Sequence, residues 1–548
     1  MGQFQIICSL CGTVCLICIQ FQGNKLKRKY TVSDARQFLL NFMMKAIILI
    51  LLTLICSVHN YNILLISPMA SPSHFILGNE LGRGLVEAGH QVTVVSPYED
   101  KNPLKGYKDV VLTGLAKQKR AISPMDMVHM NQFSISSHFA EVGNQIVNNT
   151  FHHPNFKQLI NSNEKFDVLI IQNFRTDALN ILQCHYNAPL IVFSITGPSF
   201  WVNPIVGNPL EPSYFPDFFL EYSSNMNFWQ RTVNSLLLLF NYVHKHLYFI
   251  PQQKKFMSEH FPKCTDQDAA FYNASLVFVT AHESANQPVP LVPNMINIGG
   301  HHIKPAKTLP KDLKEFMDKA KEGVVYFSLG TNVDPTNMRP EQLRAIVNAL
   351  GKIKQKVLWK HDGNVTNLSK NVQLGKWFPQ SDLLAHPNLK LFMTHGGLLS
   401  TLEAVYYGVP ILALPVFADQ NMNAAKAQQA AYGFSLPLVE VTEEKLTNAL
   451  HEVLTNPKYR ETVKIRSSLF HDRPMKPMDL AVYWTEFIVR HKGAPHLRVG
   501  SMDLRWYQYL LLDVIAAVSV VIFLVITVLY IFCVSLCCVK QKRKNKYE

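Results

Sequence analysis

Between residues 57 and 532 this chain contains only two cysteines, Cys184 and Cys264. All its other cysteines lie near one of the two ends of the sequence. Two cysteines cannot form a framework of several disulfides or supply a cysteine-rich metal cluster. Repeats of short period and low-complexity tracts are also absent. With 548 residues, the chain is long enough for two large domains.

A basic helix or stripe with interleaved aromatic residues is missing too. The formal net charge is +14, but much of it comes from residues 1–43 and 540–548. Nucleic-acid binding needs a basic patch on the folded surface rather than basic ends. We therefore expect no nucleic acid among the partners.

Charged residues are absent from residues 514–539, a run long enough to span a bilayer of ~30 Å. Aromatic residues precede this run and a basic cluster follows it, and basic flanks stay cytoplasmic. The pattern predicts a single-pass type I membrane protein with its domains in the lumen. Its parts are a linker (493–508), a transmembrane helix (509–539) and a cytosolic basic tail (540–548).

The last residues predict where this membrane protein resides. Lys544 and Lys546 stand fifth and third from the end, the register of the dilysine signal that retrieves membrane proteins to the endoplasmic reticulum. The predicted location is therefore the endoplasmic reticulum membrane. Sequons for N-glycosylation are consistent with a lumenal chain; they stand at Asn148, Asn273, Asn364 and Asn367.

Residues 1–60 are interpreted as an N-terminal extension and a signal peptide. Met44 and Lys45 precede the apolar residues 46–58, which is typical of a secretory signal. Two interpretations of the preceding residues stay open. The natural start is Met43 or Met44 and the rest is a gene-model extension, or residues 6–21 form a second targeting segment.

The stretch 377–421 carries the strongest functional pattern. Two apolar runs, 389–393 and 409–414, predict buried parallel strands, and residues 398–406 between them predict a helix. The turn after the first strand contains His395-Gly396-Gly397. Glycines there let a phosphate approach the backbone, and the helix N-terminus offers free N–H groups. This unit is therefore expected to bind a phosphate-containing ligand.

This stretch resembles the signature of the UDP-glycosyltransferases, the animal UDP-glucuronosyltransferase family in particular. The matching elements are W-x-P-Q, H-G-G, Ser400, E-A, G-V-P and D-Q, in this order. The resemblance extends from about Tyr61 to the C-terminus. It implies an α/β GT-B fold, in which two Rossmann-like doubly wound domains face a cleft. The acceptor-binding domain would span 61–287 and the UDP-sugar-binding domain 288–492.

The resemblance also implies roles for single residues in the donor site. Leu399 stands where vertebrate members often carry an asparagine, so that hydrogen-bond donor is either missing or replaced by Ser400. The implied roles are stacking on uracil for Trp377, binding of uracil or ribose for Gln380, binding of the diphosphate for Thr331, His395 and Gly397, binding of ribose for Glu403, and binding of the sugar hydroxyls for Asp419 and Gln420.

His74 is the candidate catalytic base. It follows the first predicted strand, at the carboxyl end where open α/β sheets bind ligands, and the family has its base at this position. The family orients that histidine with an acidic residue, but this chain has Gln172 there. Three possibilities stay open: Asp177 replaces the acid, His74 acts alone at a reduced rate, or the protein is weakly active.

The predicted function is that of an inverting UDP-glycosyltransferase. UDP-glucose or UDP-glucuronic acid would be the donor, and small lipophilic molecules the acceptors, since residues 198–260 are rich in apolar and aromatic side chains. No metal and no other cofactor is expected, because His395 and the helix end would hold the diphosphate. A homo-oligomer is left open. The alternatives are a catalytically weak carrier of UDP-sugars or lipophiles, suggested by Gln172, and a lipid-specific galactosyltransferase of the same fold.

Overall fold

The computed structural model of the protein describes residues 43–45, 60–118, 122 and 125–544. The predicted signal peptide and the alternatives for the start of the chain lie outside these residues, apart from a short helical piece at 43–45. From Asn60 onward the chain forms one unit, which contains two parallel sheets.

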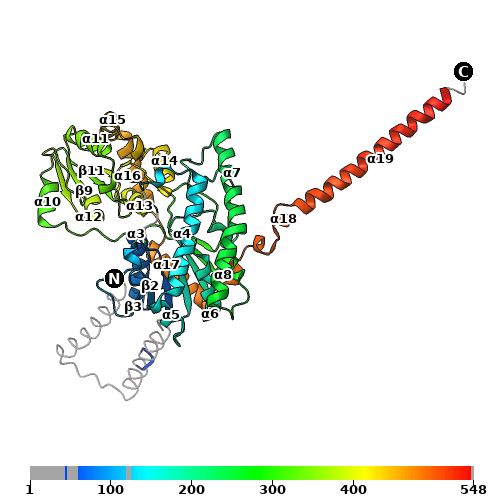
Figure 1. The fold of residues 1–548 in the computed structure, drawn as a ribbon, viewed down its shortest axis with the longest axis horizontal. Coiled ribbons are helices and arrows are strands. Elements are labelled where there is room, and N and C mark those ends of the chain that lie inside the picture. Colours follow the sequence, from blue (N-terminus) through cyan, green and yellow to red (C-terminus); the bar gives the residue numbers. More distant parts are fainter. Residues whose placement is uncertain (1–42, 46–59, 119–121, 123–124, 545–548) are drawn as a thin grey trace, which may run out of the picture. The chain divides into compact units, whose positions relative to one another are not determined.

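The first sheet has seven parallel strands in the order β3-β2-β1-β4-β5-β6-β7. Strands β2 and β3 of this sheet are labelled in Figure 1. Strands β1, β2, β4, β5 and β6 are mostly apolar and buried, as expected for a parallel sheet covered by helices, whereas the edge strands β3 and β7 are partly exposed. Their bounds are β1 (Asn62–Ile66), β2 (Gln91–Ser96), β3 (Tyr107–Val111), β4 (Val168–Asn173), β5 (Leu190–Ser194), β6 (Leu276–Val279) and β7 (Met295–Asn297).

Helix α3 (Pro72–Glu87) follows β1 directly and places His74 in its first turn. It begins with a proline, which suits the first position of a helix because no N–H is lost there. Its buried face is apolar and includes Leu77, Leu81 and Leu85. The other helices of this domain are α4 (Gln132–His152), α5 (Pro154–Ile160), α6 (Leu182–Tyr186), α7 (Phe228–His244), α8 (Ile250–His260) and α9 (Ala269–Tyr272).

The second sheet has six parallel strands in the order β10-β9-β8-β11-β12-β13. The predicted strand–turn–helix–strand unit is present as β11 (Leu389–Thr394), α13 (Leu398–Tyr407) and β12 (Ile411–Ala413). The remaining strands are β8 (Val324–Ser328), β9 (Lys356–Lys360), β10 (Val372–Gly375) and β13 (Gly433–Ser435). The helices are α10 (Lys311–Asp318), α11 (Pro340–Gly351), α12 (Gln380–Leu384), α14 (Asp419–Gln429), α15 (Glu443–Thr455) and α16 (Pro457–His471). The predicted fold class, with two Rossmann-like doubly wound domains, is thus confirmed.

The chain changes from the first sheet to the second after β7. The sequence placed this change at residue 288, but residues 295–297 pair with β6 and complete the first sheet. Helix α17 (Pro477–Arg490) later returns to the first domain and packs against α3 and β4. His90 Nε2 lies 3.4 Å from Glu486 Oε1 at this contact.

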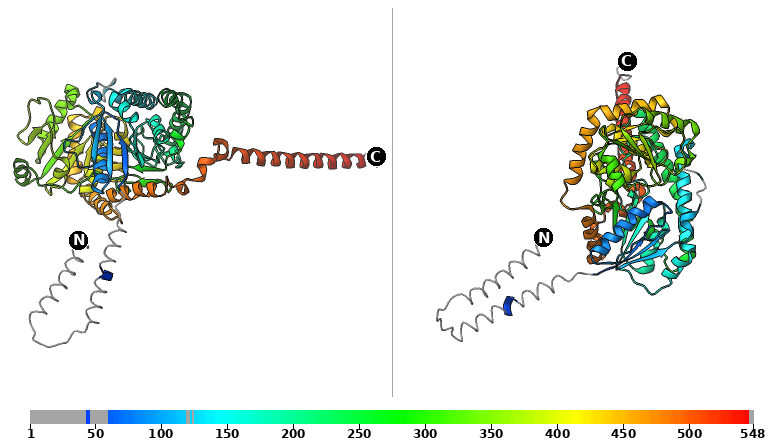
Figure 2. Two further views of the ribbon diagram at one scale, coloured as in Figure 1. Left: turned by 90° about the horizontal axis from the view of Figure 1, so that it is seen from below. Right: turned by 90° about the vertical axis from the view of Figure 1, so that its left-hand side faces the viewer.

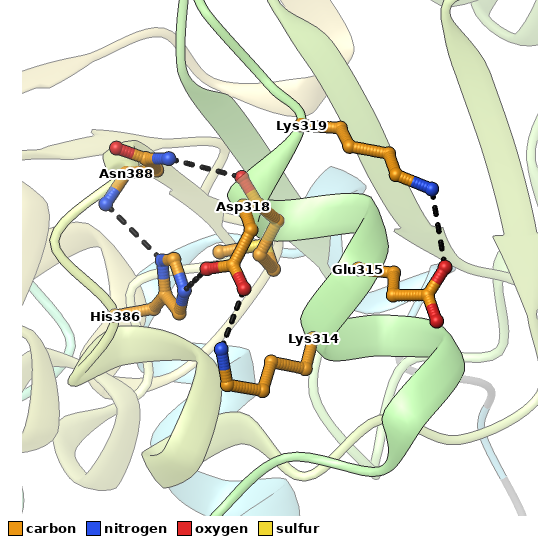
Figure 3. A network of polar contacts seen from close by, with 7 residues as sticks. Lys314, Glu315, Asp318, Lys319, His386 and Asn388 are labelled. Atoms are coloured by element: carbon orange, nitrogen blue, oxygen red, sulfur yellow. Dashed lines mark hydrogen bonds and ion pairs between the residues drawn. The ribbon is translucent and has the colours of Figure 1, made fainter.

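A polar network fastens α10 to the turn that precedes β11 (Figure 3). His386 Nε2 lies 3.1 Å from Asp318 Oδ1, and Asn388 donates to the carbonyl of Met317 at 3.0 Å. Lys314 and His386 both lower the pKa of Asp318, with the hydrogen bond from Lys314 as the largest cause. The network fixes the entry of β11, the strand that ends in the His395 turn.

The C-terminal segment contains α18 (Trp506–Tyr509) and the long helix α19 (Leu512–Lys544), which Figure 2 shows as continuous. Leu512–Cys538 comprises 27 residues and is long and apolar enough to cross a membrane. None of this span is buried against the rest of the protein. Length, composition and exposure therefore agree with the predicted transmembrane helix.

The two body cysteines, Cys184 and Cys264, form a disulfide that closes a loop across 80 positions of sequence. Such a link restricts the unfolded chain, and its loss costs typically about 2–4 kcal/mol. We expect Cys184→Ser with Cys264→Ser to lower the melting temperature of the oxidised protein, measured by scanning calorimetry. Addition of reductant should lower the melting temperature of the unmodified protein but not that of the double variant. Equal melting temperatures of the two oxidised proteins would contradict a stabilising disulfide.

Candidate active site

A cavity of about 540 Å³ lies between the two domains, at the carboxyl ends of their strands. One wall comes from α3, α4 and the loops of the first sheet, and the other from the loops after β8, β9, β10, β11 and β12. Open α/β sheets bind their ligands at this edge. The cavity lining includes these residues predicted from the sequence: His74, Thr331, Trp377, Gln380, His395, Gly397, Ser400, Glu403, Asp419 and Gln420.

His395 is held between two glycines. A Cβ atom on Gly330 would lie 2.5 Å from the imidazole Cε1, and one on Gly397 would lie 2.5 Å from Nε2. Gly330 also has φ of +77°, so the position strongly favours glycine. Burial, and then the charge of Lys360, lowers the pKa of His395 to about 4. The imidazole is therefore neutral at pH 7 and can donate one hydrogen bond into the cavity.

The N-terminus of helix α13 and the side chain of Lys360 both lie near His395. Helix α13 begins after Gly397 and directs its first N–H groups toward the turn. Lys360, at the end of β9, donates to the carbonyl of Gly330 at 2.9 Å and places its Nζ 4.5 Å from the ring centroid of Trp377. Burial lowers the pKa of Lys360. This arrangement can bind an anion such as a diphosphate.

The sequence reasoning missed Lys360. The available signal was its position, because a charged residue at the carboxyl end of a buried parallel strand faces the ligand edge of the sheet. Trp377 itself is 66% exposed, so a flat base can stack on it.

Glu403 lies one turn into α13 and faces Gln380 of α12. Gln380 Nε2 donates to Glu403 Oε2 at 2.9 Å and lies 3.4 Å from Ser400 Oγ. Burial raises the pKa of Glu403 to about 7, against the opposing effect of hydrogen bonds from Gln380 and Ser381. When ionised, this carboxylate offers acceptor oxygens to hydroxyl groups in the cavity.

Helix α14 begins with Asp419 and Gln420, whose side chains make different hydrogen bonds. Asp419 accepts a hydrogen bond from Asn423 Nδ2 at 2.8 Å, and burial raises its pKa to about 6. Gln420 Oε1 accepts from the backbone N–H groups of Val416 and Phe417 at 2.9 and 3.2 Å. The carbonyl of Gln420 thus holds its own loop, and its amide NH₂ is the group that remains for a ligand.

His74 enters the cavity from the opposite domain. Its ring packs edge-to-face on Phe174, with the centroids 5.3 Å apart. Gln172 Nε2 donates to the backbone carbonyl of His74 at 3.0 Å, and Gln172 Oε1 accepts from Ser67 Oγ at 3.0 Å. Gln172 therefore fixes the backbone of the turn that carries His74.

The His74 turn also contacts the second domain. Ser71, which precedes α3, donates to Asn332 Oδ1 at 3.0 Å, and Asn332 Nδ2 donates to Ser73 Oγ at 3.2 Å. Asn332 follows Thr331 in the loop after β8. These contacts join the loop beside His395 to the first turn of the helix beside His74.

Asp177 does not reach the cavity. It is not among the described residues that line it. Its carboxylate is fully buried, and Asn173 Nδ2 donates to it at 3.3 Å. Burial raises the pKa of Asp177, while the nearby Lys245 and Arg175 oppose this effect. Asp177 thus belongs to a buried cluster of charges inside the first domain.

The half of the cavity near His74 is mostly apolar. Helix α4 supplies much of it, which the sequence reasoning missed, whereas Phe218 comes from the predicted region 198–260. Phe200, Trp201 and Phe219 of that region are buried in the core. The apolar side chains of this half include Met69, Leu115, Ile122, Met127, Phe139, Val142, Ile146, Phe174, Ile195 and Phe218.

Comparison with known proteins places the chain among sugar-transferring enzymes. Residues 63–546 match the family model described as "UDP-glucoronosyl and UDP-glucosyl transferase". The UDP-glycosyltransferase UGT5 of Dactylopius coccus is 35% identical over 494 residues, covering 86% of this chain and 91% of that protein. The human UDP-glucuronosyltransferase 2B15 is 39% identical over 395 residues, covering 70% and 73%.

Solved structures agree on the fold. The glycosyltransferase of kitacinnamycin has a TM-score of 0.51 at 17% identity, over 78% of this chain and 98% of the other. The glycosyltransferase VinC in complex with DTDP has a TM-score of 0.51 at 14% identity, over 78% and 98%. At this level of identity the likeness concerns the fold alone.

Proposed function

Since the chain belongs to the family of UDP-glucuronosyl and UDP-glucosyl transferases, we propose that it transfers glucose or glucuronic acid from UDP to small lipophilic acceptors. One observation carries the proposal. The predicted donor residues of the second domain line the same cavity as His74 of the first, with an apolar wall beside it.

The donor would lie along the second domain. Trp377 would stack on uracil, Glu403 and Gln380 would bind the ribose, and the sugar would reach Asp419 and the amide of Gln420. His395, the start of α13 and Lys360 would meet the diphosphate. Because these groups supply hydrogen bonds and positive charge to the leaving diphosphate, the proposed reaction needs no metal ion.

The acceptor would lie in the apolar half, with its hydroxyl at His74. Deprotonation by His74 makes that oxygen a nucleophile, which attacks the anomeric carbon from the face opposite UDP. The C–O bond to UDP breaks as the new bond forms, so the configuration inverts. His74 lies in the first turn of α3 and lines the cavity.

The test is turnover by microsomes that contain the full chain. They receive UDP-glucose, UDP-glucuronic acid or UDP-galactose with a panel of phenols, and products are identified by mass spectrometry. We expect transfer from UDP-glucose or UDP-glucuronic acid, and no transfer by a His74→Ala control. Binding of UDP without transfer from any donor would favour a carrier, and transfer from UDP-galactose to lipids alone would favour the galactosyltransferase.

The same preparation tests the proposed topology, in which α19 spans the endoplasmic reticulum membrane and both domains are lumenal. UDP-sugars are charged and cross a bilayer poorly. Detergent should therefore raise the rate of sealed microsomes. A rate in intact vesicles that detergent leaves unchanged would contradict a lumenal site.

We predict that the affinity for UDP falls as the solution becomes acidic. The pKa of Glu403 is raised to about 7, so below this pH the free site carries a protonated carboxyl that has lost acceptor capacity. Binding that requires the ionised form should weaken about tenfold per pH unit below 7. His395 stays neutral here because its pKa is about 4. Calorimetric titration with UDP from pH 5.5 to 8 measures the effect.

The control is Glu403→Gln, which keeps the size of the side chain and removes the titration. UDP itself takes up a proton near pH 6 and contributes equally to both proteins. The ratio of the two affinities should therefore change with pH. A constant ratio would show that Glu403 stays ionised throughout or does not contact the ligand.

A further inference from the structure

His302 is a buried polar residue of the cavity that the roles proposed above leave unused. It follows β7 on the segment that joins the two domains, and its side chain is 2% exposed. The residue lines the cavity. Neither of its ring nitrogens has a hydrogen-bond partner among the described residues. Buried polar groups are almost always paired in native proteins, so an unpaired imidazole beside a cavity points to a ligand group.

The nearest ionisable partner is Glu403. His302 Nε2 lies 3.9 Å from Glu403 Oε1, which is too far for a direct hydrogen bond. One oxygen atom between them can lie ~2.8 Å from both atoms at once. The other carboxylate oxygen of Glu403 already accepts from Gln380 at 2.9 Å. The gap therefore suits a group that has one oxygen and can both donate and accept.

A hydroxyl meets this requirement. It donates its hydrogen to the carboxylate and accepts the N–H of the imidazole through a lone pair. A carboxylate or phosphate would instead face the negative charge of Glu403. Burial lowers the pKa of His302 to about 3, so the ring is neutral at pH 7 and carries one N–H to donate.

We propose that His302 and Glu403 together hold one ribose hydroxyl of the donor, and that this pair makes the site selective for ribonucleotides over deoxyribonucleotides. The inference rests on the proposed function, which places the ribose at Glu403. A site built to hydrogen bond a hydroxyl rejects the analogue that lacks it, because its own buried polar groups are then left unpaired.

The experiment compares UDP, 2′-deoxy-UDP and 3′-deoxy-UDP by calorimetric titration of the full chain in detergent. The unmodified protein should bind UDP at least about tenfold more tightly than one of the two deoxy nucleotides. His302→Ala should weaken UDP binding about tenfold. It should leave the affinity for that same deoxy nucleotide unchanged, because the contact is already missing there.

Two variants control for structure. His302→Gln keeps an N–H donor and should retain part of the discrimination. His301→Ala removes a neighbouring buried histidine, whose ring nitrogens lie 3.0 Å from the carbonyl of Ile298 and 3.1 Å from that of Leu77. Any loss of affinity in His301→Ala should be equal for all three nucleotides.

Three results would overturn the inference. They are an equal loss for all three nucleotides in His302→Ala, no loss at all, or equal binding of the three nucleotides by the unmodified protein, as expected if water fills the gap. UDP binding by Glu403→Ala distinguishes a failure of the His302 proposal alone from a failure of the proposed ribose site. Normal UDP binding by Glu403→Ala as well would refute the ribose site itself, whereas weak binding would leave it standing without His302.

Discussion

Replacement of His74 by alanine is expected to lower turnover about 10²–10⁴-fold, the usual contribution of a general base. The affinity for UDP should not change, because His74 lies on α3 of the first domain and the donor residues lie on the second. Single-turnover rates at saturating donor and acceptor, together with UDP titration, measure the two quantities. A folded His74→Ala protein that retains its full rate would contradict the assignment of the base.

The buried residues Gln172 and Asp177 allow a sharper version of this experiment. Gln172→Glu places a carboxylate against the carbonyl of His74, where an amide N–H now donates, so we expect it to destabilise the fold. Asp177→Asn removes a charge that faces Lys245 and Arg175 inside the domain. Because Asp177 does not line the cavity, the folded fraction of this variant should retain its rate. A specific loss of rate with normal stability would show that Asp177 acts on His74 after all.

The sequence was sufficient to predict most of the second-domain residues named as candidates that line the cavity. The run of apolar residues in β11 and β12, the glycines between them and the spacing of Ser400 and Glu403 are local features that one βαβ unit brings together. Local patterns of this kind survive folding because neighbouring parallel strands end at the same edge of a sheet.

Contacts that depend on tertiary packing were not predictable in the same way. Gln172 is one residue of a buried strand, and only the packing of β4 beside β1 shows that its amide supports the backbone of His74. His302 lies in the segment that joins the two domains, which has no periodic pattern, and only folding brings its Nε2 to 3.9 Å from Glu403 Oε1. Asp177 illustrates the converse, since closeness in sequence to Gln172 did not place it in the cavity.

The second large effect is expected at the diphosphate. His395 is neutral, so it contributes a hydrogen bond to a charged group rather than a charge of its own. Loss of such a bond costs roughly 1.5–3 kcal/mol, which corresponds to about ten- to a hundredfold in affinity. His395→Ala should therefore weaken UDP binding by this factor, and Glu403→Ala should do the same through the ribose.

The glycines around His395 separate loss of the hydrogen bond from loss of the site's shape. Gly330→Ala would place a Cβ atom 2.5 Å from the imidazole Cε1 and would strain a backbone with φ of +77°, so His395 must move while its N–H is retained. We expect this variant to weaken UDP binding as much as His395→Ala does. The double variant should be no weaker than His395→Ala, because both changes remove the same contact. Additive losses would show that Gly330 and His395 affect separate contacts with the nucleotide.

Normal UDP affinity in folded His395→Ala and Glu403→Ala proteins would refute the donor site.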